Sequence, residues 1–344
     1  MAEKIAILAP GGVGGPVGGL LTKAGHDVVL IDQWPAHVEA MKANGLRITI
    51  GTKQKPEGEI VVPVRAYHLY EVCTLRQQFD IVILTCKSYD TRWLVHFIEP
   101  YLKPDGVLVS MQNSLNDEWI SPIIGKHRDI GCVLTGGGEL LQPGHVWRNR
   151  SMNHPYYTVG ELDGKVTARL EELVKILSDA GKTTISTDIL PAKWTKLVRN
   201  SQSAVSYLCN KRSHQLLDDL RYISAVSEIT REAIQIGTAL GYNWEPINGL
   251  TAESLLGDPE RVARNIIENA AIGISEDSLG MVQHDIKVGR PSEVAGYLNG
   301  LLVRKGREAN LSTPMNEAIV ELHLRVERGE LPWDESNLDL LPKS

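Results

Sequence analysis

The segment at residues 4–18 constrains the fold of this chain more than any other. It begins as a short apolar run, Ile5-Ala6-Ile7-Leu8, and continues as Ala9-Pro10-Gly11-Gly12-Val13-Gly14-Gly15-Pro16-Val17-Gly18. Backbone that closely approaches a pyrophosphate cannot carry Cβ atoms on the approaching side. Glycines therefore occupy the turn between a first strand and a helix whose N-terminus faces the anion. The pattern predicts a dinucleotide-binding turn, although Ala9 stands at the first glycine position of G-x-G-x-x-G.

The residues that follow complete a strand-helix-strand unit. A helical stretch at residues 18–24 leads through Gly25-His26 into a second apolar run, which ends at Asp32. Asp32 lies roughly 20 residues beyond the glycines, the spacing at which a carboxylate accepts hydrogen bonds from the adenosine ribose. We expect the cofactor to be held by the turn and by this carboxylate, that is by Gly11, Gly12, Val13, Gly14 and Asp32.

Asp32 also bears on the choice of nicotinamide cofactor. A carboxylate accepts hydrogen bonds from a free 2′-hydroxyl but repels a 2′-phosphate, and the following Gln33-Trp34-Pro35 offers no Arg to reverse that preference. The sequence therefore predicts NAD, with NADP disfavoured. In the alternative interpretation, Asp32 only caps a helix that begins near Pro35.

Composition excludes several classes of protein. The chain has 344 residues, a net charge of −6 and no block of Lys or Arg. It therefore lacks the concentrated positive charge with which proteins bind nucleic acid or anionic membranes. Its apolar runs are too short to span a bilayer, and no signal-peptide pattern precedes the first strand, so we expect a cytoplasmic protein. The cysteines are scattered without a C-x-x-C pair, which predicts packing roles and no metal site: Cys73, Cys86, Cys132 and Cys209.

The order of predicted elements divides the chain in two. Strand-like segments at residues 80–85, 106–111, 130–134, 156–160 and 183–186 alternate with helical stretches at 91–102 and 168–180, which predicts a mostly parallel sheet covered by helices over residues 1–189. The pattern within residues 46–65 predicts a hairpin, which we interpret as a peripheral insertion. Residues 190–344 read as all-helical, with helices at 192–208, 223–240, 259–270, 293–309 and 316–328. The tail from residue 331 reads as extended or frayed.

Four further sites, two single residues and two residue pairs, are candidates for chemistry. Ligands of open parallel sheets collect at the carboxyl ends of strands, where Lys87 and Asn113 follow predicted strands. Lys196 and Asn200 stand four residues apart and share one helix face, but a solvated basic stripe with Lys193 and Arg199 is the alternative. Ser292-Glu293 has the form of an N-cap followed by a first-turn acid, which any helix start can use.

Together these motifs resemble those of the ketopantoate reductases, also called 2-dehydropantoate 2-reductases. Members pair an N-terminal Rossmann domain with an all-helical domain of the 6-phosphogluconate dehydrogenase type. The resemblance runs over nearly the whole chain and rests on the order of the motifs: the turn with Gly11 and Gly14, Thr85-Cys86-Lys87, Met111-Gln112-Asn113, Trp194-Thr195-Lys196-Leu197 with Asn200, Asp285, Ser292-Glu293 and Tyr297-Leu298-Asn299-Gly300.

The resemblance implies a role for each of these residues. Lys196 is implied to be the general acid, and Glu293 its partner in orienting substrate, with Asn200 as a further catalytic and substrate-binding residue. Lys87 and Asn113 are implied to hold cofactor, and Asn113 and Asp285 to contact substrate. The implied reaction is hydride transfer between nicotinamide and the carbonyl or hydroxyl carbon of a small 2-oxoacid, 2-hydroxyacid or related alcohol.

Departures from the family pattern affect the choice of substrate. Ser114-Leu115-Asn116 follows Asn113 where members commonly have glycines, Ala204 stands where they place an Asn, and one more residue precedes Tyr297. Two alternatives stay open: a nicotinamide-sensing protein without turnover, and an opine or imine reductase that reduces a C=N bond. We also expect a homodimer, in which the apolar helices at residues 223–240 and 297–303 pair across the interface.

Overall fold

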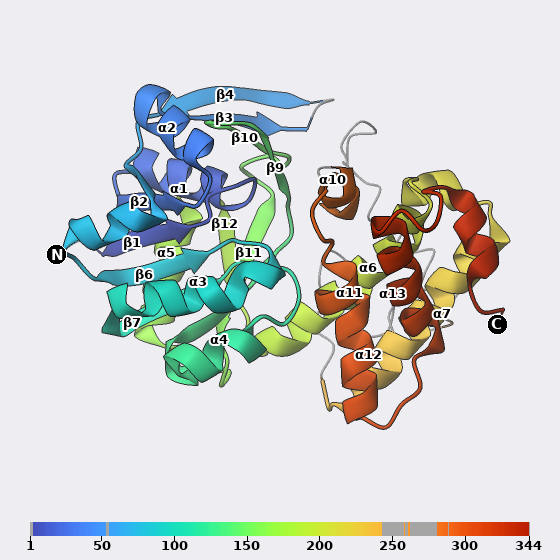
Figure 1. Ribbon diagram of the computed structural model, residues 1–344. Helices are drawn as coiled ribbons and strands as arrows, with labels where there is room; N and C mark the ends of the chain where they lie inside the picture. Colours follow the sequence, from blue (N-terminus) through green and yellow to red (C-terminus); the bar gives the residue numbers. More distant parts are fainter. Residues whose placement is uncertain are drawn as a thin grey trace. The chain divides into compact units, whose positions relative to one another are not determined.

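The computed structural model describes residues 3–52, 55–242, 258, 261, 281–287 and 289–343. The chain folds into two compact units, Met1–Ile189 and Leu190–Ser344 (Figure 1). The first unit contains the strands and the second, where described, contains helices. This confirms the predicted fold class, a Rossmann-type α/β domain followed by an all-helical domain. The helix predicted at residues 259–270 lies outside the described residues, apart from Arg261.

An eight-stranded sheet forms the centre of the first unit. Its strand order is β12-β11-β8-β7-β6-β1-β2-β5, and every neighbouring pair is parallel except β8 and β11. The strands span Lys4–Leu8 (β1), Asp27–Asp32 (β2), Ala66–His68 (β5), Phe79–Leu84 (β6), Leu102–Ser110 (β7), Asp129–Leu134 (β8), Pro155–Glu161 (β11) and Lys182–Ile185 (β12). The carboxyl ends of β1, β2, β6 and β7 therefore meet at one edge of the sheet.

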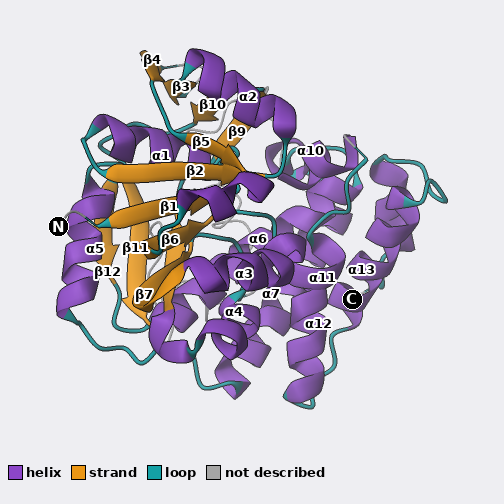
Figure 2. Ribbon diagram, turned by 60° about the vertical axis from the view of Figure 1, so that its left-hand side comes forward, coloured by secondary structure: helices purple, strands orange, loops and turns teal. Residues whose placement is uncertain are grey.

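Helices cover both faces of this sheet because strand residues alternate in direction. Ile5 and Ile7 of β1 lie in the core shared with α1 (Gly14–Lys23), α2 (Pro35–Asn44) and α5 (Ala168–Ser178). Ala6 and Leu8 lie in the opposite core, with α3 (Thr91–Ile98) and α4 (Asp117–Ile124). Figure 2 shows the strands enclosed between helices in this way.

A second sheet of four strands packs against the glycine-rich helix α1. Its order is β4-β3-β10-β9, with β3 at Leu46–Gly51, β4 at Pro56–Val62, β9 at Gly138–Gln142 and β10 at His145–Arg148. A Cβ atom on Gly18 would lie 2.9 Å from Ile7 of the large sheet, and one on Gly19 would lie 2.5 Å from Ile48 of the small sheet. The glycines thus let one helix fit between two sheets. The predicted hairpin is confirmed, but the interpretation of it as peripheral is wrong, because Ile48 lies in the main core.

The ends of several elements differ from those predicted. The helix expected at residues 91–102 ends at Ile98, and Pro100 lies in the short 3₁₀ turn that follows. β7 begins at Leu102 rather than at residue 106. Strands β5, β9 and β10 and helix α4 were not anticipated, and all of them are short.

The described part of the second unit consists of helices that pack against one another. They are α6 (Ile189–Leu208), α7 (Leu220–Ala239), α10 (Met281–Lys287), α11 (Val294–Tyr297), α12 (Asn299–Glu308) and α13 (Pro314–Glu327). The single helix predicted at residues 293–309 is therefore two helices, with a break at Leu298 (φ −109°, ψ −98°). A Cβ atom on Gly300 would lie 1.6 Å from the carbonyl oxygen of Ala295, so only glycine fits at this junction.

The C-terminal tail is packed rather than frayed, which corrects the prediction. The indole nitrogen of Trp333 donates to the carbonyl of Tyr207 at 2.7 Å, and the Asn337 amide donates to the carbonyl of Leu208 at 3.1 Å. Both acceptors lie at the end of α6, so the tail fastens onto that helix. None of the helices in the described part of the chain combines the length and apolar character that crossing a bilayer requires.

Candidate active site

The glycine-rich turn between β1 and α1 has the backbone that a close phosphate contact needs. Ala9 adopts φ +63°, the left-handed conformation that favours glycine, and its carbonyl accepts a hydrogen bond from the Gly11 amide at 2.7 Å. A Cβ atom on Gly11 would meet no described atom within 4 Å. The turn thus leaves open space beside the N-terminus of a ten-residue helix, and this arrangement fits a dinucleotide pyrophosphate. Ala9, which stands at the first glycine position of the motif, therefore keeps the turn conformation at the cost of backbone strain.

The turn is supported by β9 and by Thr85. A Cβ atom on Gly12 would lie 2.4 Å from the carbonyl oxygen of Gly138, so the two backbones are in direct contact. The Thr85 hydroxyl lies 2.8 Å from the carbonyl oxygen of Ala9 and would lie 2.2 Å from a Cβ atom on Gly14. Gly12 and Gly14 are therefore required by packing within the protein, in addition to any contact with a ligand.

His37 is a buried residue that joins the turn to the small sheet. Its Nε2 lies 3.1 Å from the carbonyl oxygen of Pro10, and its Nδ1 accepts a hydrogen bond from the Gly144 amide at 2.9 Å. Because a carbonyl can only accept and an amide can only donate, the ring carries its proton on Nε2. Sequence inspection missed this role, because a single histidine in a helix gives no signal of its tertiary partners.

Asp32 lies at the carboxyl end of β2 and is only 8% exposed. Its Oδ1 accepts a hydrogen bond from the Trp34 amide at 2.7 Å, while Trp34 itself occupies the N-cap position of α2. Asp32 therefore holds the turn between β2 and α2. The alternative in which Asp32 is the N-cap residue of α2 is wrong, because Trp34 occupies that position. The position of Asp32 at the sheet edge, next to the strand that leads into the glycine turn, is compatible with ribose binding.

Lys87 and Asn113 lie on neighbouring loops, after β6 and β7 respectively, and both are half-buried. Two amide side chains connect these loops. Gln112 donates to the carbonyl of Cys86 at 3.0 Å, and Asn116 donates to the Ser88 hydroxyl at 3.1 Å and to the carbonyl of Asn113 at 2.6 Å. The two loops that carry these candidates are thus held together by an internal network.

Ser114, the first departure from the family pattern after Asn113, adopts φ +72° and is buried. The backbone therefore keeps the left-handed conformation that glycine usually provides, even though the residue is serine. This resembles Ala9, where a non-glycine residue also keeps a positive φ.

In the second unit, α6 carries Lys196 and Asn200, which are half-buried and four residues apart. The neighbouring Trp194 anchors the helix, because its indole nitrogen donates to the carbonyl of Ala233 in α7 at 3.2 Å. Lys193 is only 2% exposed and Arg199 is half-buried. The alternative of a solvated basic stripe is therefore wrong.

Glu293 is 2% exposed and occupies the N-cap position of the single-turn helix α11. The Ser292 hydroxyl accepts a hydrogen bond from the Val294 amide at 3.3 Å, but Ser292 precedes the N-cap residue, so the predicted helix start is displaced by one residue. Asp285 is buried in α10, and its carbonyl accepts from the Arg290 amide at 2.8 Å. The implied acids are thus buried in the same unit as Lys196.

The predicted residues fall into one set in each unit. The first unit gathers the glycine turn, Asp32, Lys87 and Asn113 at one sheet edge, and the second contains Lys196, Asn200, Asp285 and Glu293. Three buried cysteines pack as predicted, whereas Cys73 is exposed. Within the described ranges, no cluster of His, Cys, Asp and Glu side chains is arranged to hold a metal ion.

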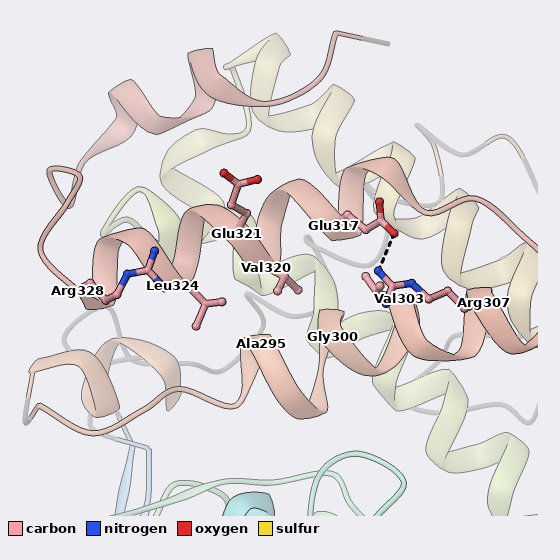
Figure 3. Close-up of a pocket in the computed structure, with 9 residues that line it drawn as sticks. All are labelled: Ala295, Gly300, Val303, Arg307, Glu317, Val320, Glu321, Leu324 and Arg328. Atoms are coloured by element: carbon pink, nitrogen blue, oxygen red, sulfur yellow. Dashed lines mark hydrogen bonds and ion pairs between the residues drawn. The ribbon is translucent and has the colours of Figure 1, made fainter.

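None of these candidate residues lines a hollow of about 550 Å³ on the helical unit. Figure 3 shows an ion pair between Arg307 and Glu317, 3.4 Å apart, at its border. The lining comes from α11, α12, α13 and Arg328, the residue after α13: Ala295, Gly300, Val303, Arg307, Glu317, Val320, Glu321, Leu324 and Arg328.

Known proteins resemble the chain along nearly its whole length. A 2-dehydropantoate 2-reductase of Archaeoglobus fulgidus is 26% identical over 332 residues, which cover 95% of this chain and 99% of that protein. The solved structure of D-mandelate dehydrogenase with NADH and anilino(oxo)acetate has a TM-score of 0.78 at 22% identity, covering 95% of this chain and 99% of that one. A dimeric ketopantoate reductase from Staphylococcus aureus has a TM-score of 0.69 at 18% identity, covering 95% and 100%.

Family models give the same result. The model for ketopantoate reductase PanE/ApbA matches residues 5–164, and the model for the C-terminal part of the same enzymes matches residues 188–327. The two matches together cover most of the chain, including the glycine turn and the helices that carry Lys196 and Glu293. The chain therefore belongs to the ketopantoate reductase family of oxidoreductases.

Proposed function

We propose that this protein is an NAD-dependent oxidoreductase acting on a small 2-oxoacid, 2-hydroxyacid or related alcohol. The observation that carries the proposal is a half-buried amine, Lys196, in the same helical unit as the buried carboxylate of Glu293, in a chain that keeps a dinucleotide turn. When bound, the nicotinamide supplies or accepts the hydride. The protein's own residues supply binding, orientation and the proton.

The first unit is proposed to hold the cofactor. Gly11, Gly12, Val13 and Gly14 present backbone at the N-terminus of α1, where amides without helical acceptors favour a pyrophosphate. Asp32 accepts hydrogen bonds from the ribose hydroxyls, and Lys87 and Asn113 contact the cofactor from the loops after β6 and β7.

The second unit is proposed to supply the acid. In the reductive direction a carbonyl oxygen gains negative charge, and the Lys196 ammonium stabilises that charge and donates a proton from Nζ. In the oxidative direction the neutral amine takes the proton back. Glu293 orients substrate through its carboxylate, and Asn200, Asp285 and Asn113 contribute hydrogen bonds to it.

The preference for NAD rests on the charge of Asp32. A buried carboxylate at the end of β2 disfavours the extra phosphate of NADP by like-charge repulsion. The D-mandelate dehydrogenase neighbour was solved with NADH, which supports the same choice here.

The substrate class follows from what the relatives share. The names 2-dehydropantoate 2-reductase and D-mandelate dehydrogenase both describe chemistry at a carbon next to a carboxylate. Ser114 and Ala204 depart from the family pattern, and we propose that they alter which side chain of the oxoacid is accepted. The dimeric relative from Staphylococcus aureus supports a homodimer as the assembled form.

Steady-state kinetics with a panel of compounds tests this function. NADH oxidation should accompany reduction of at least one 2-oxoacid, and NAD reduction should accompany oxidation of the corresponding 2-hydroxyacid. NADH binding without turnover of any carbonyl or alcohol would instead favour a sensor. Turnover that appears only after an amine is added would favour an opine or imine reductase.

A further inference from the structure

The segment that carries Glu293 is fastened to helix α13 on both sides. Before Glu293, the Ser292 amide donates to the carboxylate of Glu327 at 3.2 Å. After it, the Asn299 side chain donates to the side-chain oxygen of Asn316 at 2.9 Å. Asn316 and Glu327 lie about three turns apart on α13, so one rigid helix holds both ends of a short segment.

Asn299 also joins this segment to α6. Its Nδ2 donates to the carbonyl oxygen of Ser201 at 3.2 Å, and Ser201 directly follows Asn200 on the helix that carries Lys196. A single amide group therefore contacts α6 and α13 at once. Both Asn299 and Asn316 are completely buried.

The N-terminus of α13 is fixed in turn by Glu232 of α7. Its carboxylate accepts hydrogen bonds from the Met315 amide at 2.9 Å, the Asn316 amide at 3.1 Å and the Asn316 side chain at 2.6 Å. A carboxylate at the first turn of a helix accepts hydrogen bonds from amides that have no helical acceptor. Its negative charge also interacts favourably with the helix dipole. The polar chain thus runs from α7 through α13 to α6.

The segment needs such support because it has little structure of its own. Helix α11 has four residues, and an isolated single turn of helix is not stable. The carbonyl of Glu293 accepts from the amides of both Tyr297 and Leu298 at 2.9 Å, which compacts the turn but does not orient it. The orientation comes from the bonds to α13 and α6.

We propose that Asn299 and Asn316 are positioning residues, which hold the Glu293 carboxylate in a fixed relation to the helix that carries Lys196 and Asn200. This inference rests on the proposed roles of Lys196 and Glu293. A misplacement of a reacting group by about 1 Å can cost a hundredfold in rate. Loosening Asn299 should therefore act on the chemical step and leave cofactor binding alone.

The test is the full-length Asn299→Ala variant, assayed with NADH and the best 2-oxoacid substrate. We expect kcat to fall about 100-fold, while the Kd for NADH, measured by fluorescence titration, stays at the wild-type value. Asn316→Ala should give a loss of the same kind, since it removes the other end of the same bond. If Asn299→Ala fails to fold, Asn299→Ser and Asn316→Ala provide the measurement.

A double-variant cycle separates positioning from general loosening of the fold. In a Glu293→Gln background, Asn299→Ala should cause little further loss of kcat, because the carboxylate it positions is gone. Equal losses in both backgrounds would overturn the proposal. Wild-type kcat in Glu293→Gln alone would instead show that the proposed role of Glu293 is wrong, so the two failures are distinguishable.

Asn337→Ala is the matched control. Asn337 is buried, and its side-chain amide donates to the carbonyl of Leu208 at the end of α6 at 3.1 Å. The variant also deletes a buried amide that binds α6, but its hydrogen bonds reach neither the Glu293 segment nor a residue proposed to contact substrate. We expect a lowered Tm and an unchanged kcat. A kcat loss in Asn337→Ala as large as that in Asn299→Ala would contradict positioning.

Discussion

His37 and Pro10 are joined by a buried hydrogen bond of 3.1 Å between the imidazole Nε2 and the prolyl carbonyl. Through the same ring, the glycine turn is connected to Gly144 in the loop between β9 and β10. The orientation of the peptide between Pro10 and Gly11 therefore depends on a residue that lies in α2, outside the turn itself.

Replacement of His37 should weaken cofactor binding. His37→Leu leaves the Pro10 carbonyl without its donor and frees the turn to relax, and a lost hydrogen bond of this kind costs about 1 kcal/mol. We expect the Kd for NADH to rise roughly fivefold in fluorescence titration. His26→Leu is the control, because His26 pairs with Asp179 at the surface, and it should leave the Kd unchanged. Equal affinities of His37→Leu and wild type would contradict this account.

Asp32→Ala should reduce discrimination between the two nicotinamide cofactors. Loss of the buried carboxylate removes the repulsion of a 2′-phosphate and a hydrogen-bond acceptor for the ribose. We expect the ratio of kcat/KM for NADH to that for NADPH to fall at least about tenfold. Asp27→Ala is the matched control, because Asp27 is an aspartate that begins the same strand and pairs with Arg65. If the wild-type enzyme prefers NADPH over NADH, the proposed role of Asp32 in selecting NAD is contradicted.

Ala9→Gly should stabilise the protein. A left-handed backbone costs a residue with a Cβ atom about 1–2 kcal/mol. Glycine avoids this cost, but its more flexible unfolded state offsets roughly 0.5–1 kcal/mol of the gain in stability. The free energy of unfolding should therefore rise by about 0.5–1 kcal/mol in urea denaturation. Ala24→Gly, at a right-handed position with φ −74°, should lower it instead. A less stable Ala9→Gly variant would show that the strain is absent.

The sequence predicted those parts of the fold that local patterns encode. The glycine turn, the strand ending at Asp32 and the helix carrying Lys196 each have a periodicity or spacing that can be read directly. The roles of His37, Gln112 and Asn299 depend on partners 27, 26 and 98 residues away, and no local pattern reports such pairs. The short strands β9 and β10 were missed for the same reason, because they gain order from α1 and β3.

The stability of the helical unit should depend on pH through His323. Burial lowers the pKa of its imidazole from 6.5 to about 4, so the folded state holds the neutral ring. Between these values the unfolded chain binds the extra proton, and stability falls as the pH drops from about 6.5 to about 4, by up to about 3 kcal/mol. His323→Gln, which retains a donor, should flatten this dependence in denaturation curves across that range. An unchanged slope would contradict the assignment.

The proton-donating role of Lys196 is the centre of the account. Lys196→Met, studied beside the exposed control Lys175→Met, should lower kcat for 2-oxoacid reduction by several orders of magnitude, with the Kd for NADH nearly unchanged. Lys175→Met should match the wild type in both quantities. Wild-type turnover in Lys196→Met would contradict the account, because the ammonium would then have no part in the reaction.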